Sequence, residues 1–143
     1  MARSSYPVEV LTPEGQVFDG EVEMISTRTA TGSLGVLAHH APLMAMLEPA
    51  ELKLYTSGSE NPGSAEVERF AQGEGYLQVV DNSALLIVED ALRVDEIDRP
   101  ALESRLEEAR QGLENADEDS EEANRYRRDI ARAEAFLAID ENA

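Results

Sequence analysis

The chain contains no cysteine and no tryptophan, and aromatic residues make up only 5% of its 143 residues. Without cysteine it can form neither disulfide bonds nor thiolate metal sites, which fits a reducing cytoplasm. No apolar run approaches the ~20 residues that a membrane-spanning helix needs. No secretory signal opens the chain. We therefore expect a soluble protein that reaches a membrane only through its partners.

Basic residues are also scarce. The chain has 30 acidic residues against 12 basic ones, of which Lys53 is the single lysine, and its net charge is −18. This balance argues against nucleic acid, whose phosphates need a basic surface, and against direct docking on anionic lipid. Two interpretations of the acidity stay open. One is a salt-rich cytoplasm, because ~1 M salt shortens the Debye length to roughly 3 Å; the other is an ordinary solubilising surface.

Up to about residue 90 the apolar residues follow the period of β-strands. Leu52 and Leu54, for example, flank Lys53, and turn residues separate many short segments of this kind. The dipeptide Asp19-Gly20 is typical of a hairpin turn. Roughly seven to ten short strands predict an antiparallel β-sandwich or flattened barrel over residues 1–90.

One segment, Thr31 to Leu43, interrupts this alternation. Gly32 and Gly35 allow the positive φ angles that tight turns need. Pro42 removes a backbone donor, so a regular strand is not expected to cross it. We expect residues 31–43 to form a folded and anchored surface loop.

From residue 91 the apolar spacing changes to that of helices. Apolar residues recur every three or four positions in two stretches, which predicts two amphipathic helices in an antiparallel hairpin over residues 91–143. Asp98 is a suitable N-cap for the first helix, and Asp119 followed by Glu122 indicates a capping box for the second. The fold class is therefore α+β, mainly β. The apolar positions are Leu102, Leu106, Ala109 and Leu113, then Tyr126, Ile130, Ala133 and Leu137.

No group of residues has the pattern of a catalytic or metal site. His39 and His40 are the only histidines, and no carboxylate stands beside them. The acidic run 117–122 lacks the glycine and glutamate that an EF-hand loop needs at its sixth and twelfth positions. No Gly-Lys-Ser/Thr follows Gly32 and Gly35, so they do not form a phosphate-binding loop. The sequence thus predicts neither an enzyme nor a metal protein.

Three arginines of the second helix lie three and four residues apart, and so form one stripe: Arg125, Arg128 and Arg132. Two interpretations stay open. Asp129 and Glu121 are placed to neutralise two of the arginines within the helix. Alternatively, the stripe docks on an acidic partner surface, because arginine forks pair well with carboxylates.

Several motifs resemble the epsilon subunit of the bacterial F-type ATP synthase. They are Gly32-x-x-Gly35-Val36-Leu37-x-x-His40-Ala41-Pro42-Leu43, Leu47-Glu48-Pro49-Ala50-Glu51-Leu52, and Gly73-x-Gly75-Tyr76-Leu77-Gln78-Val79-x-x-Asn82. The resemblance covers almost the whole chain, and the motifs follow one another in the same order as in the family. It implies a non-catalytic central-stalk (rotor) subunit that couples the gamma shaft to the c-ring. Such a subunit is peripheral, at the cytoplasmic face of the bacterial plasma membrane.

The resemblance also implies which residues meet the partners. The segment that faces the c-ring and gamma would comprise Gly32, Ser33, Leu34, Gly35, His40, Ala41 and Pro42. The helical hairpin would fold on the sandwich or extend along gamma. When extended it would insert against the alpha and beta subunits and restrain ATP hydrolysis, with Arg125, Arg128 and Arg132 as its contacts.

Some members of this family bind ATP through Ile/Leu-Asp-x-x-Arg-Ala near the start of the first helix. Here Ile97 and Asp98 keep the first two residues of that motif, but Ala101 stands where the arginine belongs. We therefore expect no cofactor, and weak or absent binding of ATP as a regulatory ligand.

The alternative function is a free-standing β-sandwich module that binds a carbohydrate or a peptide, with the hairpin as a dimerisation element. A sugar site usually offers exposed aromatic rings, and this chain has only three phenylalanines and four tyrosines. Co-purification with gamma or self-dimerisation separates the two functions.

Overall fold

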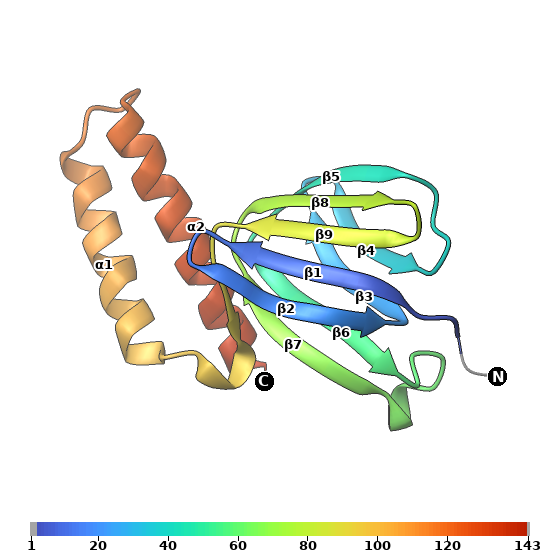
Figure 1. Cartoon of the computed structure of the whole chain (residues 1–143). Helices are drawn as coiled ribbons and strands as arrows, with labels where there is room; N and C mark the ends of the chain where they lie inside the picture. Colours follow the sequence, from blue (N-terminus) through green and yellow to red (C-terminus); the bar gives the residue numbers. More distant parts are fainter. Residues whose placement is uncertain (1–2, 143) are drawn as a thin grey trace. The chain divides into compact units, whose positions relative to one another are not determined.

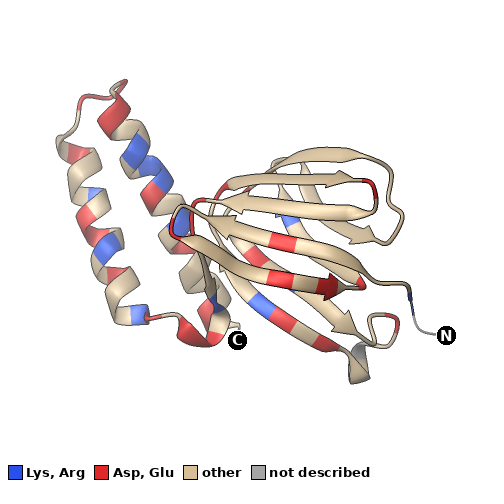
Figure 2. Cartoon of the chain, in the orientation of Figure 1, with Lys and Arg blue, Asp and Glu red and all other residues tan. Residues whose placement is uncertain are grey.

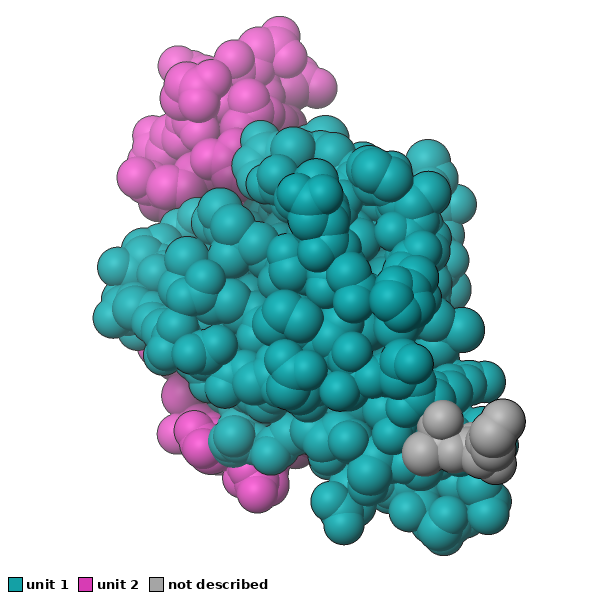
Figure 3. Space-filling view, turned by 45° about the vertical axis from the view of Figure 1, so that its right-hand side comes forward, with its two compact units in different colours: residues 1–93 teal, residues 94–143 magenta. Residues whose placement is uncertain are grey.

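The computed structural model describes residues 3–142, and the chain divides into two compact units, Met1–Arg93 and Val94–Ala143 (Figure 3). The first unit contains the strands and the second contains both α-helices. The strands are β1 (Tyr6–Thr12), β2 (Gly15–Val22), β3 (Met24–Thr29), β4 (Gly32–Leu37), β5 (Leu43–Leu47), β6 (Ala50–Ser57), β7 (Glu66–Gln72), β8 (Gly75–Val80), β9 (Ser83–Val88) and β10 (Ala91–Arg93), with a 3₁₀ turn η1 (Pro62–Ser64) before β7.

The strands form one hydrogen-bonded sheet that folds over on itself (Figure 1). Its order is β10-β7-β6-β3-β5-β8-β9-β1-β2, and β4 pairs with β3 off this path. Between β3 and β5 the ladder is a single pair, Thr29 with Leu47, so the sheet changes layer there. The predicted sandwich is confirmed. One pair differs from the prediction, because β1 lies parallel to β9 while the other pairs are antiparallel.

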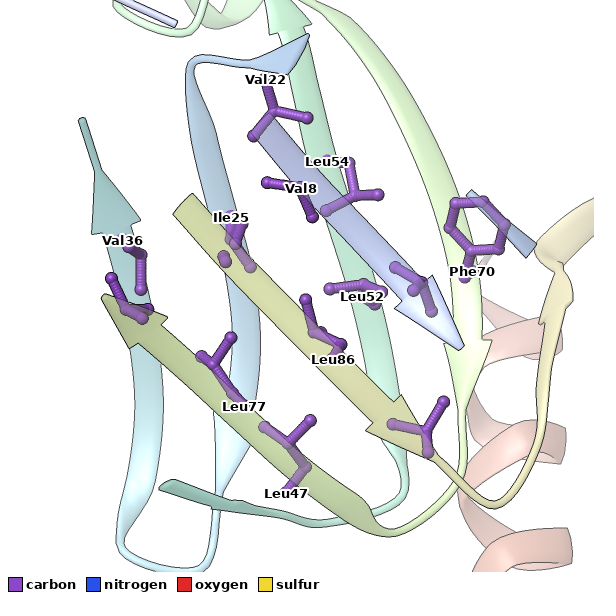
Figure 4. Packing of buried hydrophobic residues seen from close by; sticks show 14 of the residues in the cluster. Val8, Val22, Ile25, Val36, Leu47, Leu52, Leu54, Phe70, Leu77 and Leu86 are labelled. Atoms are coloured by element: carbon purple, nitrogen blue, oxygen red, sulfur yellow. The ribbon is translucent and has the colours of Figure 1, made fainter. Parts of the chain in front are cut away.

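The core lies between the two layers and is made by alternate residues of the strands (Figure 4). Leu52 and Leu54 are fully buried, as their alternation with Lys53 predicts. Phe70 meets Phe18 edge to face, with ring centroids 6.4 Å apart. Burial of each large side chain contributes about 1.5–3 kcal/mol, which makes this core the main source of stability of the unit.

One predicted turn and the end of the strand region differ from the structure. Asp19-Gly20 is not a hairpin turn, because β2 runs straight through it in register with β1; the turn lies before Gly15, whose φ is +131°. The strand region also does not end at residue 90. Residues 91–93 form β10, which pairs with the end of β7 and places the boundary of the unit after Arg93.

The second unit starts with a short 3₁₀ turn, η2 (Val94–Glu96), and continues into α1 (Arg99–Asn115) and α2 (Glu121–Glu141). Asp98 is the N-cap of α1, as predicted, and its carboxylate accepts a hydrogen bond from the backbone N–H of Ala101 (3.2 Å). The predicted cap at Asp119 is wrong. The hydroxyl of Ser120 caps α2 instead, accepting from the N–H of Ala123 (3.1 Å), which leaves no capping box.

The helices pack along the predicted stripes. Leu106, Ala133 and Leu137 form a small buried cluster, and Leu102 and Ile130 pack against it. Near the connection between the helices, Gly112 of α1 lies directly against the ring of Tyr126 of α2. Within residues 3–142, neither helix combines the length and the apolar character that crossing a membrane requires.

Candidate interaction surfaces

The predicted loop over residues 31–43 is wrong in its first half. Residues 32–37 form strand β4, in continuous antiparallel register with β3. Gly32 follows the turn and has a φ of +132°, but Gly35 keeps an ordinary strand conformation opposite Ser26. Along β4, Leu34 and Val36 point inward while Ser33 and Gly35 are exposed. Tyr6 anchors the strand from the core, because its buried hydroxyl donates a hydrogen bond to the carbonyl of Val36 at 2.6 Å. Burial raises the pKa of the Tyr6 phenol, which therefore stays a neutral donor.

The true loop is short and lies between β4 and β5. His39 adopts a left-handed conformation (φ +63°), and its N–H donates to Oδ1 of Asn82 in the β8–β9 turn (2.7 Å). The ring Nδ1 of His40 lies 2.6 Å from the carbonyl oxygen of Ala41. His40, Ala41 and Pro42 are all exposed. No regular strand crosses Pro42, as predicted, since β5 starts at Leu43.

The seven candidate residues therefore do not form one site. Gly32 and Ser33 lie at one end of β4, and His40, Ala41 and Pro42 lie beyond its other end. Six strand residues separate the ends by roughly 17 Å at ~3.3 Å per residue. The first end adjoins the end of β5, because the N–H of Ala30 donates to the carbonyl of Met46 (3.0 Å).

Sequence reasoning missed the most distinctive surface of the first unit, the outward side of β5, β8 and β9. We call it the charge-free face; it comprises Met44, Met46, Tyr76, Gln78, Val80, Leu85 and Ile87. These side chains are cross-strand neighbours: Met46 pairs with Tyr76, and Tyr76 pairs with Ile87. Met44 and Met46 are 66% and 63% exposed and Tyr76 is 52% exposed, far more than a core residue tolerates.

The three strands of the charge-free face contain no charged residue at all, although charged residues make up 29% of the chain. Figure 2 shows them tan along their length. The sequence held this signal, since each strand is apolar at both alternating positions rather than at one. A hollow of about 270 Å³ opens in the face between Met44, Tyr76, Leu85 and Ile87. An exposed contiguous apolar patch on a folded protein indicates a docking surface.

The arginine stripe of α2 is only partly neutralised. Arg125 stacks on the ring of Tyr126, with its Cζ 5.5 Å from the centroid. Arg132 lies 3.9 Å from Asp129, as one of the two interpretations predicts. Arg128 is exposed and forms no ion pair with any residue in the described range 3–142, and the predicted pairing through Glu121 does not form within that range either. Figure 2 shows basic residues in the part of α2 that follows the connection.

The remnant of the ATP motif has a structural use in this chain. The carboxylate of Asp98 caps α1, and Ile97 is half-buried before it. Ala101, where the motif has arginine, is exposed on the first turn of α1. Among the residues that the structure describes, no three or more His, Asp or Glu side chains come close enough together to hold a metal ion.

Comparison with known proteins decides the family. A family model described as "ATP synthase, Delta/Epsilon chain, beta-sandwich domain" matches residues 5–94, which is the strand-bearing unit almost from end to end. The chain belongs to the ATP synthase delta/epsilon family. The ATP synthase epsilon chain of Persephonella marina is 37% identical over 135 residues, which are 94% of this chain and 95% of that protein. The epsilon chain of Herpetosiphon aurantiacus is 34% identical over 130 residues, 91% of this chain and 85% of that one.

Solved structures show the same fold. A chain in the cryo-EM structure of the Euglena gracilis mitochondrial ATP synthase (OSCP/F1/c-ring) superposes with a TM-score of 0.73 at 23% identity, covering 94% of this chain and 80% of that one. A chain of the Tetrahymena thermophila mitochondrial ATP synthase, central stalk and c-ring, gives a TM-score of 0.63 at 21% identity, covering 96% and 98%.

This delta/epsilon-family chain is thus a subunit of an ATP synthase complex and is not itself catalytic. The alternative of a free-standing carbohydrate or peptide module is wrong. What the chain offers are the surfaces of a subunit.

Proposed function

We propose that this epsilon-family subunit belongs to the central stalk, where it joins the gamma shaft to the c-ring. It is held at the cytoplasmic face of the bacterial plasma membrane through these partners. The observation that carries the proposal is the charge-free face on a chain of net charge −18. A surface of this kind favours a permanent apolar partner, because a free subunit would otherwise gain solubility from charged residues there.

Gamma is the partner that we assign to the charge-free face. The face combines the two residue types that suit a tight interface. Tyr76 supplies a large, rigid contact with a polar tip, and Met44 and Met46 adapt to an irregular partner surface. A shaft that transmits torque needs a contact that does not slip, and apolar burial around an aromatic anchor provides one.

The two ends of β4 serve two partners in this proposal. His40, Ala41 and Pro42 continue the charge-free face, because the His39–Asn82 hydrogen bond fixes their loop to the β8–β9 turn. We assign them to gamma. Gly32 and Ser33 lie at the other end, roughly 17 Å away, and we assign them to the c-ring together with exposed Gly35 in the middle of the strand. Leu34 anchors this segment, because its side chain packs on the core.

The helical hairpin is proposed to restrain ATP hydrolysis by reaching the alpha and beta subunits. Support comes from the arginine stripe. Arg125 and Arg128 are exposed cations on a strongly acidic chain, and within residues 3–142 Arg128 has no ion-pair partner. Carboxylates of a partner would pair with them in the open hairpin.

The assignment of gamma is tested by placing charge in the charge-free face. Tyr76→Asp and Ile87→Asp change exposed outward residues, so the fold is expected to survive. Each should weaken binding to purified gamma about 100-fold or more, because a carboxylate would be buried at the interface. Ser4→Asp is the matched control, since it adds the same charge at an exposed position before β1, outside the face. Wild-type affinity in both face variants, measured by surface plasmon resonance, would remove gamma from this surface.

Cross-linking tests the assignment of the two ends. The chain has no cysteine, so Ser33→Cys and His40→Cys each introduce a single reactive site. In the assembled synthase, Ser33→Cys should cross-link to subunit c and His40→Cys to gamma. If both form the same product, the two ends meet one partner and the division is wrong.

A further inference from the structure

Arg99 joins the two ends of the helical hairpin. It is the first residue of α1, and its guanidinium donates three hydrogen bonds and forms a further ion pair. Its Nε lies 2.9 Å from Asp140, its Nη1 lies 3.1 Å from Glu103, and its Nη2 lies 3.0 Å from the carbonyl oxygen of Leu137. The carboxylate of Glu141 is the further ion-pair partner, at 3.4 Å from Nη2. Three of these groups are in the last five residues of α2, so one side chain ties the start of α1 to the end of α2.

The charges involved are unfavourable within their own helices. A helix N-terminus carries partial positive charge and a C-terminus partial negative charge. Arg99 is nevertheless at the N-terminus of α1, which has no acidic residue in its first turn, and Asp140 and Glu141 are at the C-terminus of α2, which has no basic residue in its last turn. Glu103 of the same helix offsets part of the charge of Arg99, but Asp140 and Glu141 meet a cation here only because the two ends lie together.

The rest of the hairpin makes such a contact necessary. Residues 94–143 contain sixteen acidic residues and seven arginines, so the two helices repel each other. A second ion pair between the helices, Arg110 with Glu134, is long at 3.9 Å and largely exposed. The apolar cluster between the helices is also small. Hydrogen bonds to Asp140, and then to Glu103, raise the pKa of Arg99, so the guanidinium stays charged at physiological pH and salt is the variable that weakens the contact.

We propose that Arg99 is an ionic latch that keeps the hairpin closed, and that ionic strength sets how often the hairpin opens. The latch involves residues of this chain only and needs no partner subunit. Only its consequence for ATP hydrolysis rests on the proposed function.

Two measurements on the full-length subunit test the latch. Native-state hydrogen exchange of the last turns of α2 detects rare opening. Spin labels on the exposed positions Ser104→Cys and Ala138→Cys report the geometry, since an open and continuous helix would separate them by up to roughly 50 Å. Arg99→Gln should increase exchange in the last turns of α2 and the population of long distances by roughly three- to tenfold at low salt. Raising the salt should narrow the difference between the wild type and the variant. In the wild type it screens the Arg99 contact, whereas in the variant it screens only the repulsion between the two acidic helices.

Arg110→Gln is the matched control, because it removes the same charge from the same helix and breaks the other interhelix pair. It should change exchange and distances by less than twofold. Arg99→Lys keeps the positive charge but loses the planar, forked donors of the guanidinium. Its exchange rates and distances should lie between those of the wild type and of Arg99→Gln. If circular dichroism shows that Arg99→Gln unfolds the helices, Arg99→Lys takes its place in the comparison with the wild type. Equal effects of Arg99→Gln and Arg110→Gln, or a difference between the wild type and Arg99→Gln that does not shrink as salt is raised, would overturn the latch.

A third readout separates this inference from the proposed function. In the reconstituted synthase Arg99→Gln should lower ATP hydrolysis, because more hairpins extend. If distances lengthen but hydrolysis does not fall, the latch stands and the inhibitory role of the hairpin fails. If hydrolysis is restrained normally and the distances never respond to Arg99→Gln, the latch fails and the proposed function stands.

Discussion

Gly112 and Tyr126 offer a sharp test of how the hairpin packs at its closed end. A Cβ atom added to Gly112 would lie 2.3 Å from Cζ of the Tyr126 ring and 2.5 Å from Cε1. Ordinary contact begins at about 3.4 Å. The ring would therefore have to swing away by more than about 1 Å, and half-exposed Tyr126 can do so only by giving up its contact with α1.

Two opposite effects decide the result of Gly112→Ala. Alanine is a better helix former than glycine by ~1 kcal/mol, which stabilises α1 in any conformation. Displacing the ring costs about 1–2 kcal/mol in lost contact and strain. In the wild-type background we expect a net destabilisation of about 0–1 kcal/mol. In a Tyr126→Ala background the obstacle is gone, and the same Gly112→Ala change should stabilise the hairpin by ~1 kcal/mol.

The assay is a double-mutant cycle of four full-length proteins, unfolded in urea and followed by far-ultraviolet circular dichroism, which reports chiefly on the helices. A coupling energy of about 1–2 kcal/mol between the two positions is expected. If Gly112→Ala stabilises the protein equally with and without Tyr126, the ring does not lie on Gly112 and the packing described above is incorrect.

Three further results are expected. Replacing Arg125, Arg128 and Arg132 together with alanine should barely change the stability of the free subunit, since exposed pairs contribute only ~0–1 kcal/mol each, and it should raise ATP hydrolysis by the reconstituted synthase; unchanged hydrolysis would leave the stripe as a solvated surface. Residues 1–93 expressed alone should fold and bind gamma, as judged by circular dichroism and pull-down, whereas an unfolded fragment would mean that both units share one cooperative transition. Titration calorimetry should find weak or absent ATP binding because Ala101 replaces the motif arginine, and tight one-to-one binding would require another arginine in that role.

Local patterns in the sequence predicted most of the elements. The alternation around Lys53 marks β6 correctly, because a half-buried strand has to point every second residue inward. The spacing of Leu102 and Leu106 likewise marks the face of α1 that packs on α2. Such patterns depend only on residues that are close together in the sequence.

Turn signals were less dependable, because pairing overrides local preference. Asp19-Gly20 often forms a hairpin turn, yet here both residues continue the ladder with β1. Gly32 and Gly35 indicate a turn, although Leu34 and Val36 alternate as in a strand. The sequence therefore predicts a loop where the structure has β4. Glycine permits a turn without requiring one.

The candidate surfaces depend on contacts between distant segments, which no local pattern contains. The charge-free face exists because β5 pairs with β8 in a register that places Met46 beside Tyr76. The contact of Arg99 with Asp140 likewise spans nearly the whole hairpin. Sequence alone places the arginine stripe on one side of a helix, but it does not reveal that Arg99 bonds to residues at the end of α2.

The parallel pairing of β1 with β9 has a consequence for the synthesis of this chain. β1 is translated first, but Val8 pairs with Ala84 and Val10 with Leu86, near the end of the first unit. Until those residues leave the ribosome, β1 has only β2 beside it, and an isolated two-stranded hairpin is marginally stable. Contacts between such distant segments also form slowly. A nascent chain that stalls before Val88 therefore cannot settle as a smaller sandwich, and it presents the unpaired edge of β1 to whatever chaperone or protease reaches it first.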